Sequence, residues 1–412
     1  MEHNNHHMKI MSIVGARPNF MKVAPIARAI QNHNSSGGHP AVTHIIVHTG
    51  QHYDEQMSNL FFRELEIPEP HYNLEVGSGS HAMQTAQIME RFEPVLLKEQ
   101  PDVLLVIGDV NSTVACALVA TKIQYNGQSC RRRPLIAHVE AGLRSRDRDM
   151  PEEINRILTD ALSDVLFVTE LEALTNLERE GVKMEKIYFV GNVMIDTLIS
   201  HQAKARNLNT LETVMSEQCN SMALKEKLTS ASNREKARYG LVTLHRPSNV
   251  DTAGALRPLM DCMRKIATRI PLIFPLHPRT KNNLLQFGLL GAGDQQENIL
   301  YTNPLGYLEF LNLMLDASLV LTDSGGIQEE ATFLRIPCIT LRNNTERPVT
   351  ITMGTNYLVG TNPDRILQTA LDVIAGNKKK CFIPPLWDGQ AGARIIDIIT
   401  RQITSAPITA AF

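Results

Sequence analysis

The sequence has few of the features that mark secreted, metal-binding or membrane-spanning proteins. Its 412 residues include six cysteines, none in a Cys-x-x-Cys pair or beside a histidine at zinc-ligand spacing. This scarcity indicates free thiols in a reducing compartment and no metal site. No apolar run approaches the ~20 residues that span a bilayer, and the N-terminus lacks the apolar core of a signal peptide. We therefore expect a cytoplasmic protein, with His3, His6 and His7 in a polar leader.

Strong net charge is also missing. The chain has 41 basic and 43 acidic residues, giving a formal net charge of −2. This balance provides no field to gather nucleic acid or an acidic membrane surface, so neither is an expected partner. Hydrophobic residues make up 43% of the chain, which excludes wholesale disorder. At ~100–200 residues per domain, the length predicts two or three domains.

Short apolar runs alternate with longer segments of helical spacing. In the first half these runs begin at Lys9, His44, Val103, Leu135, Val165 and Ile187. Most are apolar throughout, as in strands that helices cover on both faces of a parallel sheet. After a polar stretch, the pattern restarts with runs at Tyr239, Leu272, Ile299, Leu319, Pro337 and Asn356. We therefore predict two α/β domains, each a Rossmann-like, doubly wound parallel sheet.

The polar stretch at 201–238 fixes the expected domain boundaries. The N-terminal domain is predicted at 8–198 and the C-terminal domain at 199–389, with a last helix at about 390–412 crossing back to the first domain. Ligands of open parallel sheets sit at the carboxyl ends of the strands, and clefts between domains are frequent ligand sites. We expect the functional residues in such a cleft.

The segment LVLTDSGGIQEEATF carries the strongest local signal for a ligand. Its turn at 323–326 ends a strand and opens a helix, and Ser324 can cap that helix. The glycines allow backbone N–H groups to approach a phosphate at the helix N-terminus. Glu330, one turn further on, can accept hydrogen bonds from ribose hydroxyls. The alternative is a capped helix whose acidic residues favour its own dipole.

Carboxylates follow two buried strands and open one helix. Asp109 ends the strand of IGDVNST, and Glu140 lies in HVEAGLR; buried carboxylates of this kind usually have a partner or a role. Glu152 and Arg156 are four residues apart in MPEEINRILTD, so they share a helix face. The three carboxylates favour acid–base catalysis, and the alternative for the helical pair is a simple stabilising ion pair.

Basic residues mark further strand ends. Arg17 and Lys22 surround a helix start after the first strand, where cations are unfavourable unless an anion binds; surface solvation is the alternative. His245 and His277 also end strands, and each is a candidate for either a structural role in the core or a functional role. The segment VGSGSHA at Gly77 matches a dinucleotide fingerprint but follows only a weak strand, so we do not expect a nicotinamide cofactor.

Together these segments resemble the non-hydrolysing UDP-N-acetylglucosamine 2-epimerase family. The matching pieces occur in the family's order from about Lys9 to Ile395 and include GARPNFMKVAPI, IGDVNSTVA, HVEAGLRS, MPEEINRILTD, TLHRPSNVD, TDSGGIQEEA and NNTERPVTITMG. The resemblance implies the GT-B fold, with the active site between the two domains. It also implies a homodimer that interconverts UDP-GlcNAc and UDP-ManNAc with neither metal nor cofactor.

The resemblance carries specific roles to matching positions. It assigns catalysis to Asp109, Glu140, Glu152, Arg156 and His245. It assigns substrate binding to Arg17, Lys22, Leu305, Phe310, Ser324, Gly325, Gly326, Glu330 and Arg347. The implied chemistry removes UDP from C1 and a proton from C2, giving a glycal, and then reverses both steps with the proton returning on the opposite face.

Two segments depart from the pattern of many bacterial members. HRPSN replaces HRREN, and GQHYDEQM stands where AQHR is common; some members bind a second, activating UDP-GlcNAc there, so that regulation is not predicted. Both variants also occur among epimerases of UDP-diacetamido sugars, whereas TERP favours plain UDP-GlcNAc. A hydrolysing epimerase, a GT-B glycosyltransferase and a non-catalytic UDP-sugar sensor are the competing hypotheses.

Overall fold

Two α/β units make up the fold of the computed structural model. The structure describes residues 7–50, 62, 64–125, 132–232, 239–290 and 298–405. Unit 1 comprises Met1–Ile199 and Pro385–Phe412, and unit 2 comprises Ser200–Pro384. The chain first passes from one unit to the other within helix α7 (Val193–Arg206). Among the described residues, no helix has both the length and the apolar character needed to cross a membrane.

Unit 1 is built on a seven-stranded sheet in the order β3-β2-β1-β4-β5-β6-β7, and all of its strand pairs are parallel. The central strand β4 is buried along its whole length, as its apolar sequence predicts. Only the two-residue edge strand β3 lies outside the predicted runs. The strands are β1 (Met8–Val14), β2 (Val42–His48), β3 (Tyr72–Asn73), β4 (Val103–Ile107), β5 (Leu135–Ala141), β6 (Val165–Val168) and β7 (Ile187–Phe189).

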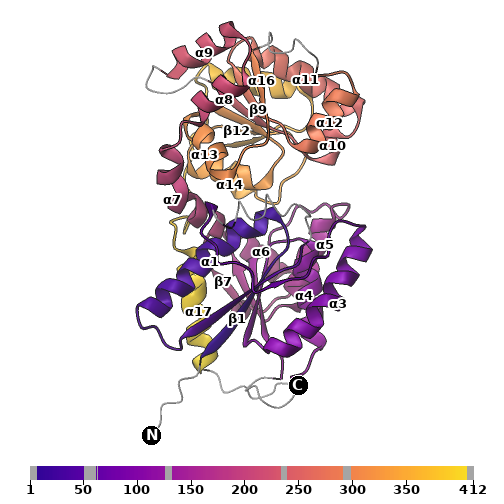
Figure 1. The fold of residues 1–412 in the computed structure, drawn as a ribbon, viewed down its shortest axis with the longest axis vertical. Coiled ribbons are helices and arrows are strands. Elements are labelled where there is room, and N and C mark those ends of the chain that lie inside the picture. Colours follow the sequence, from indigo (N-terminus) through magenta and orange to yellow (C-terminus); the bar gives the residue numbers. More distant parts are fainter. Residues whose placement is uncertain are drawn as a thin grey trace. The chain divides into compact units, whose positions relative to one another are not determined.

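Helices cover this sheet on both faces. Helix α1 packs with the C-terminal helix α17 on one side, while α3, α4 and α5 pack side by side on the other (Figure 1). The helices of this unit are α1 (Arg17–Ser35), α3 (His81–Glu99), α4 (Asn111–Lys122), α5 (Pro151–Leu162), α6 (Leu171–Arg179), a 3-10 turn (Met184–Lys186), the first part of α7, and α17 (Ala391–Ser405).

Unit 2 repeats the plan with a six-stranded parallel sheet in the order β10-β9-β8-β11-β12-β13. This confirms the predicted fold class of two Rossmann-like parallel sheets. The strands are β8 (Gly240–Thr243), β9 (Leu272–Pro275), β10 (Ile299–Thr302), β11 (Leu319–Thr322), β12 (Cys338–Thr340) and β13 (Asn356–Leu358).

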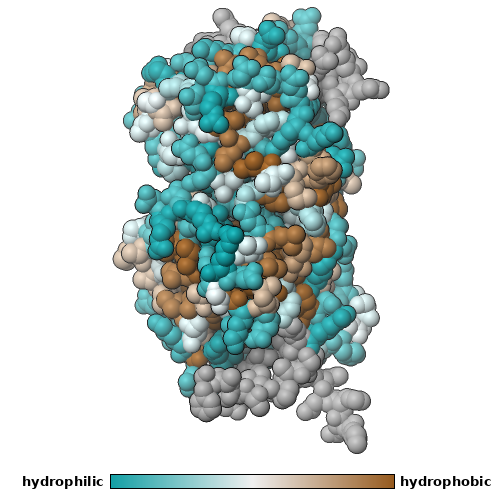
Figure 2. Space-filling model, turned by 180° about the vertical axis from the view of Figure 1, so that it is seen from behind, coloured by the Kyte–Doolittle hydropathy of each residue, from teal (hydrophilic) through white to brown (hydrophobic). Residues whose placement is uncertain are grey.

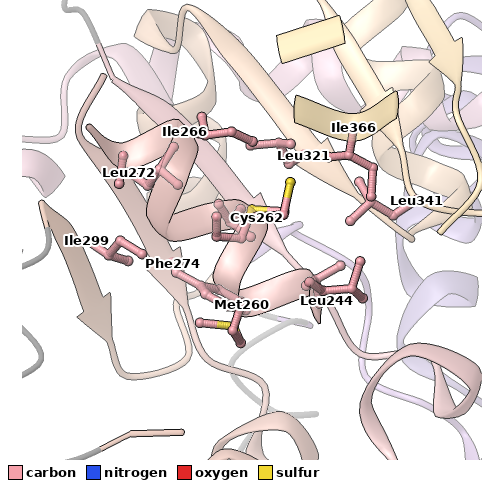
Figure 3. Close-up of a cluster of buried hydrophobic side chains, with 14 of the residues drawn as sticks. Leu244, Met260, Cys262, Ile266, Leu272, Phe274, Ile299, Leu321, Leu341 and Ile366 are labelled. Atoms are coloured by element: carbon pink, nitrogen blue, oxygen red, sulfur yellow. The ribbon is translucent and has the colours of Figure 1, made fainter. Parts of the chain in front are cut away.

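The core of unit 2 lies between this sheet and helices α11 and α16. In the close-up of Figure 3, Met260 and Ile266 of α11 and Ile366 of α16 lie with strand residues such as Leu321. All four are completely buried. The helices are α8 (Thr210–Gln218), α9 (Met222–Ser232), α10 (Pro247–Val250), α11 (Ala253–Ala267), α12 (Pro278–Gln286), α13 (Tyr307–Asp316), α14 (Gly325–Phe333), α15 (Val349–Thr352) and α16 (Pro363–Ile374).

The N-terminal end of α17 is held closely within unit 1. The Gly392 N–H donates to Asp196 Oδ2 at 2.8 Å, and burial raises the pKa of Asp196 to about 6. Trp387 Nε1 donates to the Thr169 carbonyl at 3.3 Å. A Cβ atom on Gly392 would lie 2.7 Å from the carbonyl oxygen of Pro25 in α1. Glycine is therefore needed here for close helix packing.

We expect Gly392→Ala to lower the stability of unit 1 by about 1–3 kcal/mol, because the new methyl group would push α17 away from α1. Thermal unfolding followed by circular dichroism would measure the loss. The control is Gly254→Ala at the start of α11, where an added Cβ meets nothing within 4 Å. That change should be neutral or slightly stabilising. Equal melting temperatures for Gly392→Ala and the unchanged protein would contradict the packing argument.

Candidate active site

Glu140 lies at an irregular point of strand β5. Its φ is +73°, in the left-handed region that non-glycine residues rarely adopt, and the pairing of β5 with β6 shifts between Val139 and Ala141. Bulges of this kind redirect a side chain, and strained backbone of this kind is concentrated at functional sites. The irregularity singles out Glu140 among the residues of β5.

The carboxylate of Glu140 forms an ion pair with Lys22 of α1. Both side chains are almost fully buried, with 4% and 5% exposed. Gly108, which follows β4, allows this approach: its φ is +70°, and a Cβ there would lie 2.9 Å from Lys22 Nζ. Burying a carboxylate without a cation is costly, and Lys22 supplies the cation for Glu140.

Asp109 is held by α5 at the end of the neighbouring strand β4. Its Oδ2 accepts hydrogen bonds from Arg156 Nε at 3.0 Å and lies 2.9 Å from Arg156 Nη2. Asn155 Nδ2 donates to the main-chain carbonyl of Asp109 at 2.9 Å. The Asp109 side chain remains 24% exposed. It is therefore both fixed in place and accessible.

Glu152 differs from these two carboxylates. It is half-buried in the first turn of α5 and has no hydrogen bond or ion pair with other described residues. Arg156, four residues on, pairs instead with Glu153, which is 2% exposed and also accepts hydrogen bonds from the N–H groups of Ser145 and Arg146. Sequence reasoning missed Glu153, although its i,i+3 spacing from Arg156 was a usable signal.

Some residues that the sequence selected lie outside the described part of the structure. Arg17 begins α1, but its side chain is not described. Gln51–Met57 of the GQHYDEQM segment, together with His3 and His6, also lie outside the described residues.

In unit 2, Asp323 organises the turn that follows β11. Its side chain is fully buried and accepts hydrogen bonds from the main-chain N–H groups of His245 (3.1 Å) and Arg246 (2.9 Å). His245 Nδ1 lies 3.0 Å from Asp323 Oδ1. Burial alone would raise the pKa of Asp323, but the bonds from His245, Arg246 and Asn249 lower it below its usual value. The ionised carboxylate therefore fixes the position of His245.

The start of α14 differs in one respect from the expectation. Ser324 occupies the N-cap position, but its side chain makes no capping hydrogen bond, so the predicted cap is wrong. The main-chain N–H of Ser324 donates to Thr322 Oγ1. A Cβ at Gly325 would lie 2.6 Å from Glu346 Oε1 and 2.9 Å from Arg347 Nη1, so a larger residue would have to displace these two side chains. Gly326 follows in the first turn and is half-buried.

Glu330 is a buried acid on α14. Burial raises its pKa to about 8, although the hydrogen bond from the Tyr307 hydroxyl at 3.1 Å lowers it. Arg347 is also buried and lies 2.9 Å from Glu329 and 2.6 Å from Glu346. Leu305 and Phe310 are half-buried on either side of the start of α13, whose first residue is Tyr307. Tyr307 carried no signal in the sequence.

These motifs are accompanied by similarity to known proteins. The sequence model of the UDP-N-acetylglucosamine 2-epimerase family matches residues 35–400. The chain belongs to this family. A UDP-N-acetylglucosamine 2-epimerase of Methanocaldococcus jannaschii is 42% identical over 395 residues, covering 95% of this chain and 99% of the relative. A UDP-2,3-diacetamido-2,3-dideoxy-D-glucuronate 2-epimerase of Pseudomonas aeruginosa is 39% identical, covering 96% of this chain and 100% of the relative.

Solved structures agree with this family membership. The M. jannaschii UDP-GlcNAc 2-epimerase in complex with UDP-GlcNAc and UDP has a TM-score of 0.79 and 41% identity, covering 96% of this chain and all of that chain. In the present epimerase-family chain, unit 1 contains the candidate residues Lys22, Asp109, Glu140, Glu152 and Arg156. Unit 2 contains His245, Leu305, Phe310, Ser324, Gly325, Gly326, Glu330 and Arg347.

The buried pair in unit 1 leads to a stability prediction. We expect Lys22→Met to destabilise the protein by about 3–5 kcal/mol, because it leaves Glu140 buried without its cation. The double variant Lys22→Met/Glu140→Gln should recover most of this loss, since it removes both charges. Urea denaturation of the single and double variants would measure the coupling.

Lys9→Met is the matched control for that experiment. Lys9 also pairs with a carboxylate of unit 1, Glu99, but its side chain is 35% exposed. Its ion pair should contribute at most about 1 kcal/mol. Losses of equal size for Lys9→Met and Lys22→Met would refute a special role for the buried pair.

Proposed function

We propose that this epimerase-family protein interconverts UDP-GlcNAc and UDP-ManNAc by eliminating UDP and adding it back. The carboxylates of unit 1 are the observation that carries the proposal. Asp109 and Glu140 are each paired with a cation, whereas Glu152 has no such partner among the described residues. Removing a proton from one face of a carbon and returning one to the other face requires carboxyl groups in different environments.

The chemistry proceeds in balanced steps. UDP leaves C1 with the electrons of the C1–O bond, and the oxocarbenium character at C1 makes the C2 proton acidic. A carboxylate removes that proton, giving a glycal and UDP. A carboxylic acid then returns a proton to the opposite face of C2, and UDP bonds again to C1. No oxidant or nicotinamide is consumed.

Unit 2 supports the nucleotide part of the proposal. The N-terminus of α14 presents main-chain N–H groups to an anion, and the Ser324 hydroxyl is not used as a helix cap. Glu330 suits the ribose hydroxyls, and Leu305 and Phe310 suit the uracil ring. Arg347 and His245 complete the diphosphate site.

The proposal includes a cytoplasmic homodimer. The five cysteines of the described residues are free thiols, as in a reducing compartment. Hydrophobic residues lie open on the surface of unit 1 in Figure 2. Independently of that view, three large hydrophobic side chains of α3 and α5 are exposed: Met83 (58%), Leu97 (38%) and Leu158 (47%). Such exposed apolar surface is suited to contact with a second copy.

A UDP-diacetamido sugar is the second candidate substrate. The observation that favours it is the 39% identity to the P. aeruginosa 2-epimerase named for such a sugar. That compound carries a negatively charged carboxylate in addition to the diphosphate. In this chain, Arg347 is already paired with two carboxylates, which favours the uncharged sugar of UDP-GlcNAc.

We expect UDP-GlcNAc turned over in D₂O to give UDP-ManNAc with deuterium at C2, because a carboxyl group that exchanges with solvent returns the proton. NMR of the products, with no nicotinamide added, is the measurement. Asp109→Asn, Glu140→Gln and Glu152→Gln should each lower kcat by roughly 10²–10⁴.

Each different product would point to a different reaction. Free ManNAc and UDP would identify a hydrolysing epimerase, and epimerised product with hydrogen kept at C2 would exclude elimination. Turnover of a UDP-diacetamido sugar but not UDP-GlcNAc would establish the second candidate. Near-normal kcat in all three carboxylate variants would refute the acid–base assignment.

Glu330 gives a prediction for UDP binding. Its pKa of about 8 means that the carboxyl group is protonated at about pH 7 in the free protein. Ribose hydroxyls donate best to the ionised form, so UDP binding should release a proton, and affinity should rise from about pH 7 to about pH 8. Isothermal titration calorimetry in buffers of different ionisation enthalpy measures both effects.

Glu330→Gln is the control for this measurement. It should weaken UDP binding roughly ten- to a hundredfold, as expected for loss of a hydrogen bond of ~1.5–3 kcal/mol to a charged group. It should also remove the proton release, whereas ionisation of UDP itself remains the same in both proteins. Unchanged affinity and unchanged proton release would mean that the ribose does not contact Glu330.

A further inference from the structure

Helix α5 has its polar face turned into the protein. The residues that it buries are all polar or charged: Glu153, Asn155, Arg156, Thr159 and Asp160. Leu158, in contrast, is 47% exposed. A helix on a sheet ordinarily buries its apolar stripe. Burial of the polar face indicates that this side of α5 does more than pack against the sheet. Two of its residues, Arg156 and Asn155, donate hydrogen bonds to Asp109.

Asp160, on the same face, contacts strand β5 and the turn that follows it. Its Oδ1 accepts a hydrogen bond from His138 Nδ1 at 2.6 Å. Its Oδ2 accepts from the Gly142 N–H at 3.1 Å and lies 2.7 Å from Arg144 Nη2. Burial alone would raise the pKa of Asp160, but His138 and Arg144 lower it, so the carboxylate is ionised.

His138 extends this contact to strand β4. Its ring is fully buried, and Nε2 lies 2.9 Å from the main-chain oxygen of Gly108. A carbonyl only accepts, so Nε2 donates to it; an ionised carboxylate also only accepts, so Nδ1 donates to Asp160. His138 therefore uses both ring nitrogens as donors and links Asp160 to Gly108.

The two turns reached by Asp160 are those that carry the carboxylates of unit 1. Gly108 immediately precedes Asp109 and packs against Lys22, the cation of Glu140. Gly142 follows the irregular point of β5 at Glu140. A shift of either turn would therefore move a carboxylate or its cation.

We propose that Asp160 is a positioning residue for Asp109 and Glu140, acting through His138 on the Gly108 carbonyl and directly on the Gly142 amide. The inference rests on the proposed function, because it concerns the carboxylates that move the proton. Asp160 and His138 act through the two turns and not by contact with the substrate. Errors of about 1 Å in the placement of reacting groups can cost on the order of 10² in rate.

Asp160→Asn tests the proposal, with Asp164→Asn as the matched control. Asp164 also braces β5, but at the opposite, amino-terminal end: it pairs with Arg133 at 2.8 Å and accepts from the Ile136 N–H at 3.0 Å. Both variants exchange an acceptor oxygen for an NH₂ group. Asp160→Asn should lower kcat of UDP-GlcNAc epimerisation roughly 10- to 100-fold and leave the Kd for UDP unchanged. Asp164→Asn should keep kcat within about twofold, even if its melting temperature falls.

His138→Gln provides a second variant in case Asp160→Asn does not fold. It keeps the bonds of Asp160 to Arg144 and Gly142 but has one donor nitrogen where the doubly bonded imidazole has two, so kcat should fall by a smaller factor with unchanged Kd for UDP. Wild-type kcat in the folded variants would overturn the proposal. So would an equal loss of kcat in Asp164→Asn, because that would indicate general destabilisation of β5.

A readout without substrate separates this inference from the proposed function. In ¹⁵N-histidine-labelled wild-type protein, both ring N–H protons of His138 should be visible and slow to exchange with solvent, with assignment by comparison with His138→Gln. In Asp160→Asn the Nδ1 proton should lose this protection. If the wild-type protein does not epimerise UDP-GlcNAc, the proposed function fails, and the ring protons alone decide the inference. A His138 ring with one protected N–H would overturn it.

Discussion

The requirement that a buried carboxylate must have a cation or a set of N–H donors determines much of unit 1. Glu140 is almost completely buried and depends on Lys22, which comes from a helix more than a hundred residues earlier in the sequence. That pairing in turn requires Gly108, since any side chain there would occupy the space of the lysine. Glu140 has a left-handed φ of +73°, and its ion pair with Lys22 helps to hold the side chain in this conformation.

In helix α5, the same requirement reverses which face of the helix is buried, so that the polar face lies inside. Its inward face carries two carboxylates and one guanidinium, and each has a partner in a loop or on a strand end. The desolvation of these groups is expensive, so the ion pairs add little net stability. Their main effect is to set the positions of the neighbouring turns, because ion pairs and hydrogen bonds are directional and apolar contacts are not.

Unit 2 contains two buried acids whose pKa values are shifted in opposite directions. Asp323 receives N–H donors and a histidine and stays ionised, whereas Glu330 is buried beside Tyr307 and has a pKa near 8. The first carboxylate is a fixed structural element. The second has its pKa raised by burial, so hydroxyl donors from a ligand would stabilise its ionised form.

The sequence by itself determined the alternation of apolar runs and helices, and with it the two parallel sheets, because strands buried on both faces cannot alternate polar and apolar residues. It also singled out Asp109, Glu140, Glu330 and the turn at 323–326 as candidates, because motif order and strand ends are local properties. Only the tertiary structure decided which charges pair. Arg156 turns to Asp109 and Glu153 instead of Glu152, and Asp160 reaches two turns that are distant in the sequence. Such choices depend on which strand lies beside which and on the direction of each side chain, and neither is recorded in local spacing.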